Sequence, residues 1–336
     1  MKEALLYEKL EDQRVHCYLC AHHCRIADNA FGICGVRQNK AGELVTHTFG
    51  KLIAAHVDPI EKKPLYHFLP GTPSYSVATA GCNFRCGFCQ NWEISQLSVR
   101  DGTIPKTREY RPEEIVSSAE HTGCASIAYT YTEPTIYFEL AYETAQLARQ
   151  QGLKNVFVTN GFMTAQAIEM IAPYLDAANI DLKYFNAQSY KTICGGDLQP
   201  VLDSIRLMRT LGIWVEVTTL VVPGSNDSDE ELGGIADFLA SVDKDLPWHI
   251  SRFFPQYKFN ETKPTPEETL KKAEQCGRRA GLRYVYPGNV SGWGSDTVCS
   301  RCGKTVIKRE GFEVVAFNIK DDCCVFCRQK IPGIFV

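Results

Sequence analysis

Short apolar runs alternate with helical patterns between about residues 74 and 287. The short runs are rich in β-branched and aromatic residues, whereas the segments between them repeat apolar residues at helical spacing. The expected strands are 75–80, 126–131, 155–159, 178–183, 214–221 and 249–253, and the expected helices are 112–121, 136–151, 165–175, 198–211, 229–242 and 266–280. Six strand–helix units in series predict an α/β fold with a parallel sheet and outer helices, short of a closed eight-stranded barrel.

The two ends of the chain lack this alternation and are rich in cysteine. Residues 1–70 contain four cysteines and several histidines, and they show little periodicity before Leu52. Residues 291–336 contain five cysteines around a short β-like stretch at 312–318. We therefore expect a metal-binding N-terminal region at 1–70, the α/β region at 71–290 and a metal-binding C-terminal region at 291–336.

Composition argues against several classes of protein. The net charge of −3 gives no basic surface of the kind that nucleic-acid-binding proteins use. The charged first ten residues do not form a signal peptide, and no apolar run approaches the roughly 18 residues of a membrane span. Without an export signal, fifteen cysteines indicate metal sites in a reducing compartment. We therefore expect a soluble, cytoplasmic protein that binds neither nucleic acid nor membrane.

The most informative motif is a group of three cysteines directly after the first expected strand. Cys82, Cys86 and Cys89 have the spacing C-x3-C-x2-C, and no fourth cysteine follows for 34 residues. A structural zinc site and an electron-carrying iron–sulfur cube each take four protein ligands. Three thiolates on one short loop therefore indicate a [4Fe-4S] cluster with one iron open to a ligand outside the protein. A zinc site completed by a distant histidine is the alternative.

This loop resembles the cluster loop of radical S-adenosylmethionine (SAM) enzymes over the run Gly81-Cys82-Asn83-Phe84-Arg85-Cys86-Gly87-Phe88-Cys89. The resemblance implies that the amino and carboxylate groups of SAM chelate the open iron. It also implies that Phe88 lies near the adenine and that the fold is a partial (β/α)6 barrel. In such a barrel, chemistry gathers on the loops at the carboxyl ends of the strands.

Two further strand ends carry motifs similar to those of this family. Segment 129–134 resembles the Gly-Gly-Glu-Pro motif at the SAM amino group, with two larger residues in place of the glycines. The resemblance implies that Glu133 accepts from the amino group, and a Glu-Pro helix start is the alternative. The run from Thr159 and Asn160 to Gly161 resembles a turn of glycyl-radical-enzyme activases. It implies that Thr159 and Asn160 bind the ribose or the methionyl carboxylate.

The fourth and sixth expected strands add three candidate residues. Strand alternation puts Asp181 and Lys183 on one face, so both side chains can point into the barrel. The resemblance assigns Lys183 to the SAM carboxylate and Asp181 to the ribose or a nearby cation, and a structural ion pair between them is the alternative. His249 begins the sixth strand and resembles the family histidine near the nucleoside, although a structural histidine is equally expected there.

The cysteines at the two ends form metal-binding patterns. The N-terminal set is Cys17, Cys20, Cys24 and Cys34. It suits zinc, which we favour, or a second [4Fe-4S] cluster, because spacing does not decide between them. The C-terminal set is Cys299, Cys302, Cys324 and Cys327. Its two C-x2-C pairs predict a zinc ribbon, with a single rubredoxin-like iron as the alternative occupant and Cys323 as the alternative ligand to Cys324. The isolated cysteines, expected as small buried side chains, are Cys124, Cys194 and Cys276.

Nearly the whole chain resembles one subgroup of the radical SAM enzymes. The matching segments are 17–34, 58–68, 81–93, 129–134, 249–256 and 327–333. The subgroup is the radical SAM component of the AmmeMemoRadiSam system, which is pyruvate formate-lyase activating enzyme-like. It implies association with Memo-like and AMMECR-like proteins. Segment 58–68 is interpreted either as a substrate lid or as a solvated linker.

These motifs together predict a radical SAM enzyme. Its [4Fe-4S] cluster would cleave SAM reductively to a 5′-deoxyadenosyl radical, which abstracts hydrogen from an unidentified small molecule or peptide. A low-potential donor such as ferredoxin or flavodoxin would supply the electron. One alternative is an activase that installs a glycyl radical on a partner enzyme. A non-catalytic metalloprotein, either an electron carrier or a zinc-ribbon adaptor, is the alternative from another class.

Overall fold

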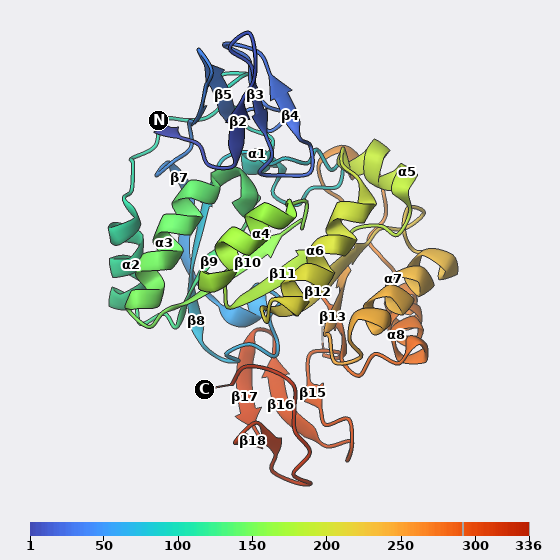
Figure 1. Cartoon of the computed structure of the whole chain (residues 1–336). Helices are drawn as coiled ribbons and strands as arrows, with labels where there is room; N and C mark the ends of the chain where they lie inside the picture. The colour runs from blue at the N-terminus through green and yellow to red at the C-terminus, as the bar shows by residue number, and fades with distance from the viewer. Residues whose placement is uncertain (291, 336) are drawn as a thin grey trace.

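The computed structural model describes residues 1–290 and 292–335, and a mixed sheet forms its centre (Figure 1). Its strands, in spatial order, are β14 (Val285–Gly288), β13 (Trp248–Arg252), β12 (Trp214–Val221), β11 (Ala177–Asp181), β10 (Lys154–Thr159), β9 (Ser126–Tyr129), β8 (Pro73–Thr79) and β7 (Leu52–Pro59). Strands β8 to β14 run parallel, and β7 pairs antiparallel with β8 at one edge. The parallel strands therefore end at one common edge, where their loops meet.

Helices cover the outer face of this sheet (Figure 1). The helices between successive strands are α2 (Pro112–His121), α3 (Phe138–Gln150), α4 (Ala165–Ile171), α6 (Leu198–Thr210), α7 (Asp229–Val242) and α8 (Glu267–Ala280), and the shorter ones are α1 (Trp92–Ser95) and α5 (Ala187–Ser189). Local signals set their ends. Ser228 caps α7 by accepting from the backbone N–H of Glu231 at 3.1 Å, and α8 ends at Gly281 with φ of +98°.

The six expected strands and six expected helices are all present, with ends that shift by a few residues. The periodicity missed two strands, the four-residue β14 and the edge strand β7. The parallel part of the sheet thus has seven strands, where the sequence predicted six. Strand β14 is too short to show a period, and β7 has half-buried and exposed residues in its middle that do not alternate with buried ones.

The N-terminal region forms two small three-stranded sheets above the carboxyl edge of the main sheet (Figure 1). Its strands are β1 (Lys2–Glu3), β2 (Tyr7–Lys9), β3 (Val15–Cys17), β4 (Cys24–Ile26), β5 (Arg37–Lys40) and β6 (Glu43–Thr46). Hydrogen bonds tie it to the loop after β10, where the Thr164 hydroxyl donates to the Tyr18 carbonyl at 2.8 Å. The metal-binding pattern of this region therefore lies on the side of the barrel where the strands end.

The C-terminal region lies at the opposite end of the barrel (Figure 1). Its strands are β15 (Thr297–Val298), β16 (Thr305–Glu310), β17 (Glu313–Phe317), β18 (Ile319–Lys320) and β19 (Cys323–Cys324). From β16 the fully buried Arg309 reaches the barrel, where it donates to the Tyr66 carbonyl at 2.7 Å and lies 3.4 Å from Glu61. The region is thereby joined to the amino ends of the strands.

Segment 58–68 is neither a lid nor a solvated linker. Its first residues belong to β7, and the rest is buried beneath the amino ends of the strands, where Ile60, Leu65 and Phe68 pack against Ala177 and Trp214. Sequence missed this role because three charged residues of the segment, Asp58, Glu61 and Lys63, are themselves buried, whereas Lys62 is exposed. None of the helices in residues 1–290 and 292–335 combines the length and apolar character that a membrane span requires.

Candidate functional site

The three cysteines of the 82–89 loop lie where β8 ends. The loop has no regular secondary structure. A hydrogen bond to another segment holds it, in which the backbone N–H of Arg85 donates to the Cys194 carbonyl at 2.7 Å. The Ser95 hydroxyl lies 3.1 Å from the sulfur of Cys89. Cys82 is approached by the side-chain amide of Asn160 at 3.8 Å. Hydrogen-bond donors next to the ligand sulfurs are a usual feature of iron–sulfur sites.

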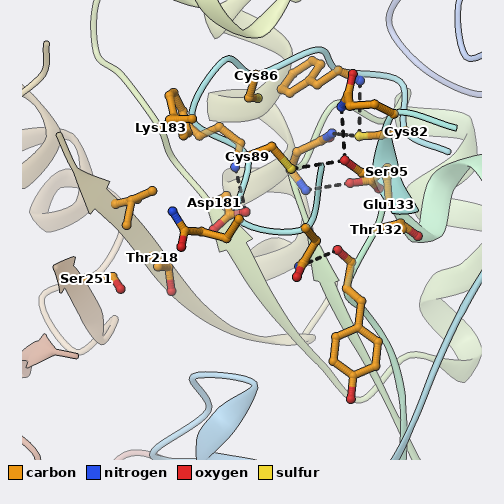
Figure 2. Close-up of a pocket in the computed structure, with 18 residues that line it drawn as sticks. Cys82, Cys86, Cys89, Ser95, Thr132, Glu133, Asp181, Lys183, Thr218 and Ser251 are labelled. Atoms are coloured by element: carbon orange, nitrogen blue, oxygen red, sulfur yellow. Dashed lines mark hydrogen bonds and ion pairs between the residues drawn. The ribbon is translucent and has the colours of Figure 1, made fainter. Parts of the chain in front are cut away.

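These thiols face a cavity of about 230 Å³ at the carboxyl edge of the sheet (Figure 2). Residues from the ends of five parallel strands and from the cluster loop line it. The lining consists of Cys82, Phe84, Cys86, Phe88, Cys89, Gln90, Asn91, Ser95, Gln96, Tyr131, Thr132, Glu133, Asn160, Asp181, Lys183, Thr218, Leu220 and Ser251. Figure 2 shows the thiols on one side of this cavity, with Thr218 and Ser251 on the other.

Glu133 is fixed at the rim of the cavity by four hydrogen bonds. Its Oε1 accepts from the hydroxyl of Thr159 at 2.7 Å and from the hydroxyl and backbone N–H of Thr135, and its Oε2 accepts from the backbone N–H of Asn160 at 2.8 Å. Burial raises the pKa of this carboxyl, whereas these donors lower it. The same residue also begins the short 3-10 helix Pro134–Tyr137. The two interpretations of the Glu-Pro pair are therefore compatible.

Thr159 and Asn160 have different positions. The Thr159 hydroxyl is bonded to Glu133 and lies outside the cavity lining, so it positions the carboxylate. Asn160 lines the cavity and donates to the side-chain oxygen of Asn83 at 2.7 Å. The turn between them and α4 needs Gly161, whose φ is +70° and whose added Cβ would lie 2.8 Å from Ile180.

Asp181 and Lys183 both line the cavity and form an ion pair in which Lys183 Nζ lies 2.8 Å from Asp181 Oδ2. Burial alone would lower the pKa of Lys183, but the charges of Asp181 and Cys86 outweigh it and raise that pKa well above its usual value. The lysine is therefore a permanent cation beside the thiols. Its Nζ also lies 6.0 Å from the centre of the Phe88 ring, a buried side chain of the cavity wall.

His249 does not lie at the cavity. Its Nε2 is 2.6 Å from Oε2 of Glu216, and its ring stacks on Tyr286. That contact with His249 lowers the pKa of Glu216 against the opposing effect of burial. In this position His249 contacts Glu216 and Tyr286 and is absent from the cavity lining, which favours the structural alternative; its contact with a nucleoside stays a prediction.

Several cavity residues were not singled out by the sequence. Ser95 and Ser251 are common polar residues without a motif, and only the fold brings them together at the cavity. Cys194 was expected as an ordinary buried cysteine, and it is buried, but a hydrogen bond with its side chain lowers the pKa of Cys86. The Gly195-Gly196 pair directly after it was the only hint.

The four C-terminal cysteines converge closely. The ligand sulfurs of Cys299, Cys302, Cys324 and Cys327 all lie within 4.8 Å of one another. The separations are 3.6 Å between Cys299 and Cys327 and 3.8 Å between Cys302 and Cys324. Four thiolates at about 2.3 Å from one tetrahedral ion would stand about 3.8 Å apart. The group contains Cys324 and leaves Cys323 out, which favours Cys324 as the candidate ligand.

The four N-terminal cysteines are arranged differently. Cys17, Cys20, Cys24 and Cys34 line one apolar cavity together with His22, Arg37, Thr135 and Ile136. In the described part of the chain, no group besides the C-terminal one brings three or more potential ligands as close together. The N-terminal thiols thus surround a space, as the thiols of the 82–89 loop do.

Comparisons with known proteins agree with this geometry. Residues 76–239 match the family model described as Radical SAM superfamily. The chain is 44% identical to uncharacterized protein MJ0808 of Methanocaldococcus jannaschii over 98% of its own length and 99% of that protein. It is 27% identical to the putative glycyl-radical enzyme activating enzyme MJ1632 of the same organism, covering 64% of this chain and 79% of that one. A radical SAM methyltransferase from Sphaerobacter thermophilus has a similar fold, with a TM-score of 0.52, 17% identity and 71% of each chain covered.

Proposed function

Because the chain belongs to the radical SAM superfamily, and is thus an enzyme with a [4Fe-4S] cluster and SAM as its cofactors, we propose that Cys82, Cys86 and Cys89 hold that cluster. The observation that carries the proposal is one cavity that joins these three thiols to a fixed carboxylate and a largely buried cation. Strands β8 to β13 would correspond to the family's partial (β/α)6 barrel.

The donor set of the cavity fits both cofactors. Three thiols without a fourth in the loop suit a cube with one open iron. The side-chain nitrogen of Asn83, beside Cys82, is buried without a hydrogen-bond partner within the described residues, so a donor is available there. When bound, the reduced cluster supplies the electron that cleaves SAM to methionine and a 5′-deoxyadenosyl radical, which abstracts hydrogen from the substrate.

Each neighbouring residue then has a definite task. Glu133 would accept from the SAM ammonium, and its four hydrogen bonds keep the carboxylate in one orientation. Lys183 would bind the SAM carboxylate, with Asp181 keeping the cation in place until SAM arrives. Phe88 would contact the adenine, and the ring, being buried, would exclude water from that side.

The decisive experiment uses anaerobic protein with a reconstituted cluster and dithionite as the reductant. Wild-type protein should convert SAM to 5′-deoxyadenosine and methionine, and its reduced EPR signal should shift when SAM is added. Cys86→Ala should lose both properties. The matched control is Cys276→Ala, a buried cysteine of α8, which should keep them. Full SAM cleavage by Cys86→Ala would refute the cluster assignment.

A second candidate function is activation of a glycyl-radical enzyme. The observation in its favour is the 27% identity to a putative glycyl-radical enzyme activating enzyme over 64% of this chain. The substrate would then be a backbone glycine of a partner protein. Incubation with such a partner and SAM should give the doublet EPR signal of a glycyl radical, whereas a small-molecule substrate would give none.

The remaining proposals concern the extensions, partners and compartment. We propose zinc at the C-terminal thiols, since their separations fit a tetrahedral ion. We propose that the N-terminal region ends near residue 50, because β7 is part of the main sheet. We also propose membership of the AmmeMemoRadiSam subgroup, which would imply Memo-like and AMMECR-like partners, and co-purification would test this. Fifteen free cysteines favour a reducing cytoplasm that contains a ferredoxin or flavodoxin.

A further inference from the structure

We propose that Cys17, Cys20, Cys24 and Cys34 hold a second [4Fe-4S] cluster, which receives electrons from a low-potential donor and passes them to the cluster of the 82–89 loop. The inference rests on the proposed function of that loop. It replaces the zinc that we favoured from the sequence for the N-terminal set, where spacing does not decide between the two. Three observations carry it.

The first observation is the arrangement of the thiols. The C-terminal sulfurs meet as closely as ligands of one tetrahedral ion do. The N-terminal sulfurs do not converge in that way among the described residues, and they line a cavity instead. A cube with an iron at each thiolate keeps its ligands farther apart than a single ion does. The N-terminal set resembles the 82–89 set in having its thiols around a cavity, although that cavity is much smaller, about 20 Å³ against about 230 Å³.

The second observation is a charge that suits such a cluster. Arg37 is 2% exposed, and its guanidinium lies 3.5 Å from the sulfur of Cys17. On its other side it pairs with the buried carboxylate of Glu139. A cube with four thiolates is an anion, and it gains a further negative charge on reduction. A fixed buried cation next to one sulfur stabilises that reduced state.

The third observation is the pair of short connections between the two cysteine sets. His22 lies between Cys20 and Cys24, and its Nε2 is 2.8 Å from the backbone carbonyl of Asn83, the neighbour of Cys82. Arg85, the neighbour of Cys86, donates to the carbonyl of Ile33 at 3.0 Å. Each connection thus joins a residue at one set to a residue beside a cysteine of the other.

The cavity of the N-terminal set also adjoins the SAM site. Thr135 lines that cavity, and its hydroxyl donates to Glu133 at 2.6 Å. The region sits over the carboxyl edge of the barrel, whereas the C-terminal region lies at the far end (Figure 1). An electron that enters at the N-terminal cysteines would therefore arrive where SAM is cleaved. Zinc has no redox chemistry, so zinc at these cysteines could not deliver an electron to the nearby SAM site.

The electron balance of the relay is simple. A reduced ferredoxin or flavodoxin loses one electron, and the N-terminal cluster goes from the 2+ to the 1+ state. That cluster then returns to 2+ as the cluster of the 82–89 loop goes from 2+ to 1+. No proton or bond changes in these two steps.

The occupancy test removes the other cluster. The variant Cys82→Ala/Cys86→Ala/Cys89→Ala, purified and reconstituted without oxygen, should contain about four iron and four sulfide per chain, with one zinc in the C-terminal ribbon. Mössbauer spectra should show a cube. Retained C-terminal zinc and a native circular dichroism spectrum establish that the variant folds. Two zinc ions and no iron in this variant would overturn the second cluster.

The complementary variant separates this inference from the proposed function. Cys20→Ala/Cys24→Ala should keep the EPR signal that shifts with SAM, and it should keep cleavage with dithionite within about threefold. With reduced ferredoxin as the donor, its cleavage should fall at least tenfold. A missing SAM-sensitive signal in wild-type protein would instead refute the proposed function. Unchanged ferredoxin-driven cleavage would refute the relay.

Adjacent histidines provide a test of the route. His22→Ala should keep about eight iron per chain but slow the reduction of the second cluster by ferredoxin several-fold, measured by rapid-freeze EPR. His23→Ala is the matched control, because that exposed ring contacts His16 at 3.2 Å and not the 82–89 loop. Equal rates in the two variants would exclude the His22 connection.

Discussion

Lys183 shows how single residues set the chemistry of the cavity. A lysine buried without a partner would lose its proton, since burial disfavours the charged form. Asp181 prevents this, and the two side chains reach the cavity together because they alternate with Leu182 at the end of β11. Lys183 therefore stays charged and can bind an anionic ligand.

We therefore predict that Lys183→Met weakens SAM binding. A hydrogen bond between charged groups is worth about 1.5–3 kcal/mol, so the Kd should rise roughly 10- to 100-fold. Isothermal titration of SAM into cluster-loaded protein measures it. The control is Lys191→Met, which should not change the Kd, because Lys191 is an exposed lysine of the short helix Tyr190–Cys194. A Kd within twofold of wild type for Lys183→Met would remove the residue from the site.

At the scale of elements, the loop after β10 is fixed by one backbone conformation. Gly161 has φ of +70° and packs against Ile180 of β11 and Val201 of α6. This turn sets the direction of Asn160, which approaches Cys82. A change here should therefore affect both stability and the cluster.

Gly161→Ala should destabilise the protein more than Gly212→Ala. Both glycines have positive φ, but a Cβ at Gly212 meets no heavy atom within 4 Å, whereas at Gly161 it would be 2.8 Å from Ile180. Gly212→Ala therefore measures the backbone cost alone, about 1–2 kcal/mol, and the clash should add at least about 1 kcal/mol. Urea unfolding of anaerobic protein gives both values. Equal values would show that Ile180 moves aside freely.

At the scale of the whole molecule, a cysteine-rich region lies at each end of the main-sheet strands (Figure 1). The C-terminal region is attached through Arg309, which is paired with Glu61 and bonded to the Tyr66 carbonyl. His67 adds a second link, because its Nδ1 lies 2.7 Å from the carbonyl of Pro332 while its Nε2 lies 2.6 Å from the hydroxyl of Tyr286. These contacts join the C-terminal region to the amino ends of the main-sheet strands.

Arg309→Met should reduce the free energy of unfolding by about 3–5 kcal/mol, because it leaves Glu61 as a buried, unpaired carboxylate. Arg301→Met, an exposed arginine of the same ribbon, should change it by less than about 0.5 kcal/mol. Zinc content should stay at the wild-type level in both variants. If zinc is retained and the two variants are equally stable, the ribbon is not anchored through Arg309.

Low pH should reduce the stability that His67 contributes where the C-terminal region joins the amino ends of the strands. Burial lowers the pKa of His67 to about 4, and the unfolded chain has a pKa of about 6.5, so between these values the unfolded state binds the extra proton. His67 thus contributes its full stabilisation above pH 6.5. As the pH falls toward 4, the free energy of unfolding decreases by about 3 kcal/mol in total. Thermal unfolding at pH 7.5 and 5.0 should show this loss for wild type and a smaller one for His67→Gln. An identical pH dependence would contradict it.

Part of this architecture could be predicted from sequence because its signals are local. Strand and helix periods extend over a few residues, so the six strand–helix units of the middle region were recognised. A cysteine triplet within eight residues is a local signal that predicted a cluster site, and family motifs at strand ends led to Glu133, Asn160, Asp181 and Lys183, which all line the cavity.

Other features depend on contacts between segments far apart in the chain. The burial of segment 58–68, the turn of His249 toward Glu216 and the arrival of Thr218 and Ser251 at the cavity follow from strand order and side-chain packing. The contact of His22 with Asn83 spans 61 positions, and no local pattern encodes it. Sequence by itself determined which cysteines are candidate metal ligands and where six of the main-sheet strands form. Tertiary structure alone decided which of them meet, because the distance between thiols is set by how the loops that carry them pack.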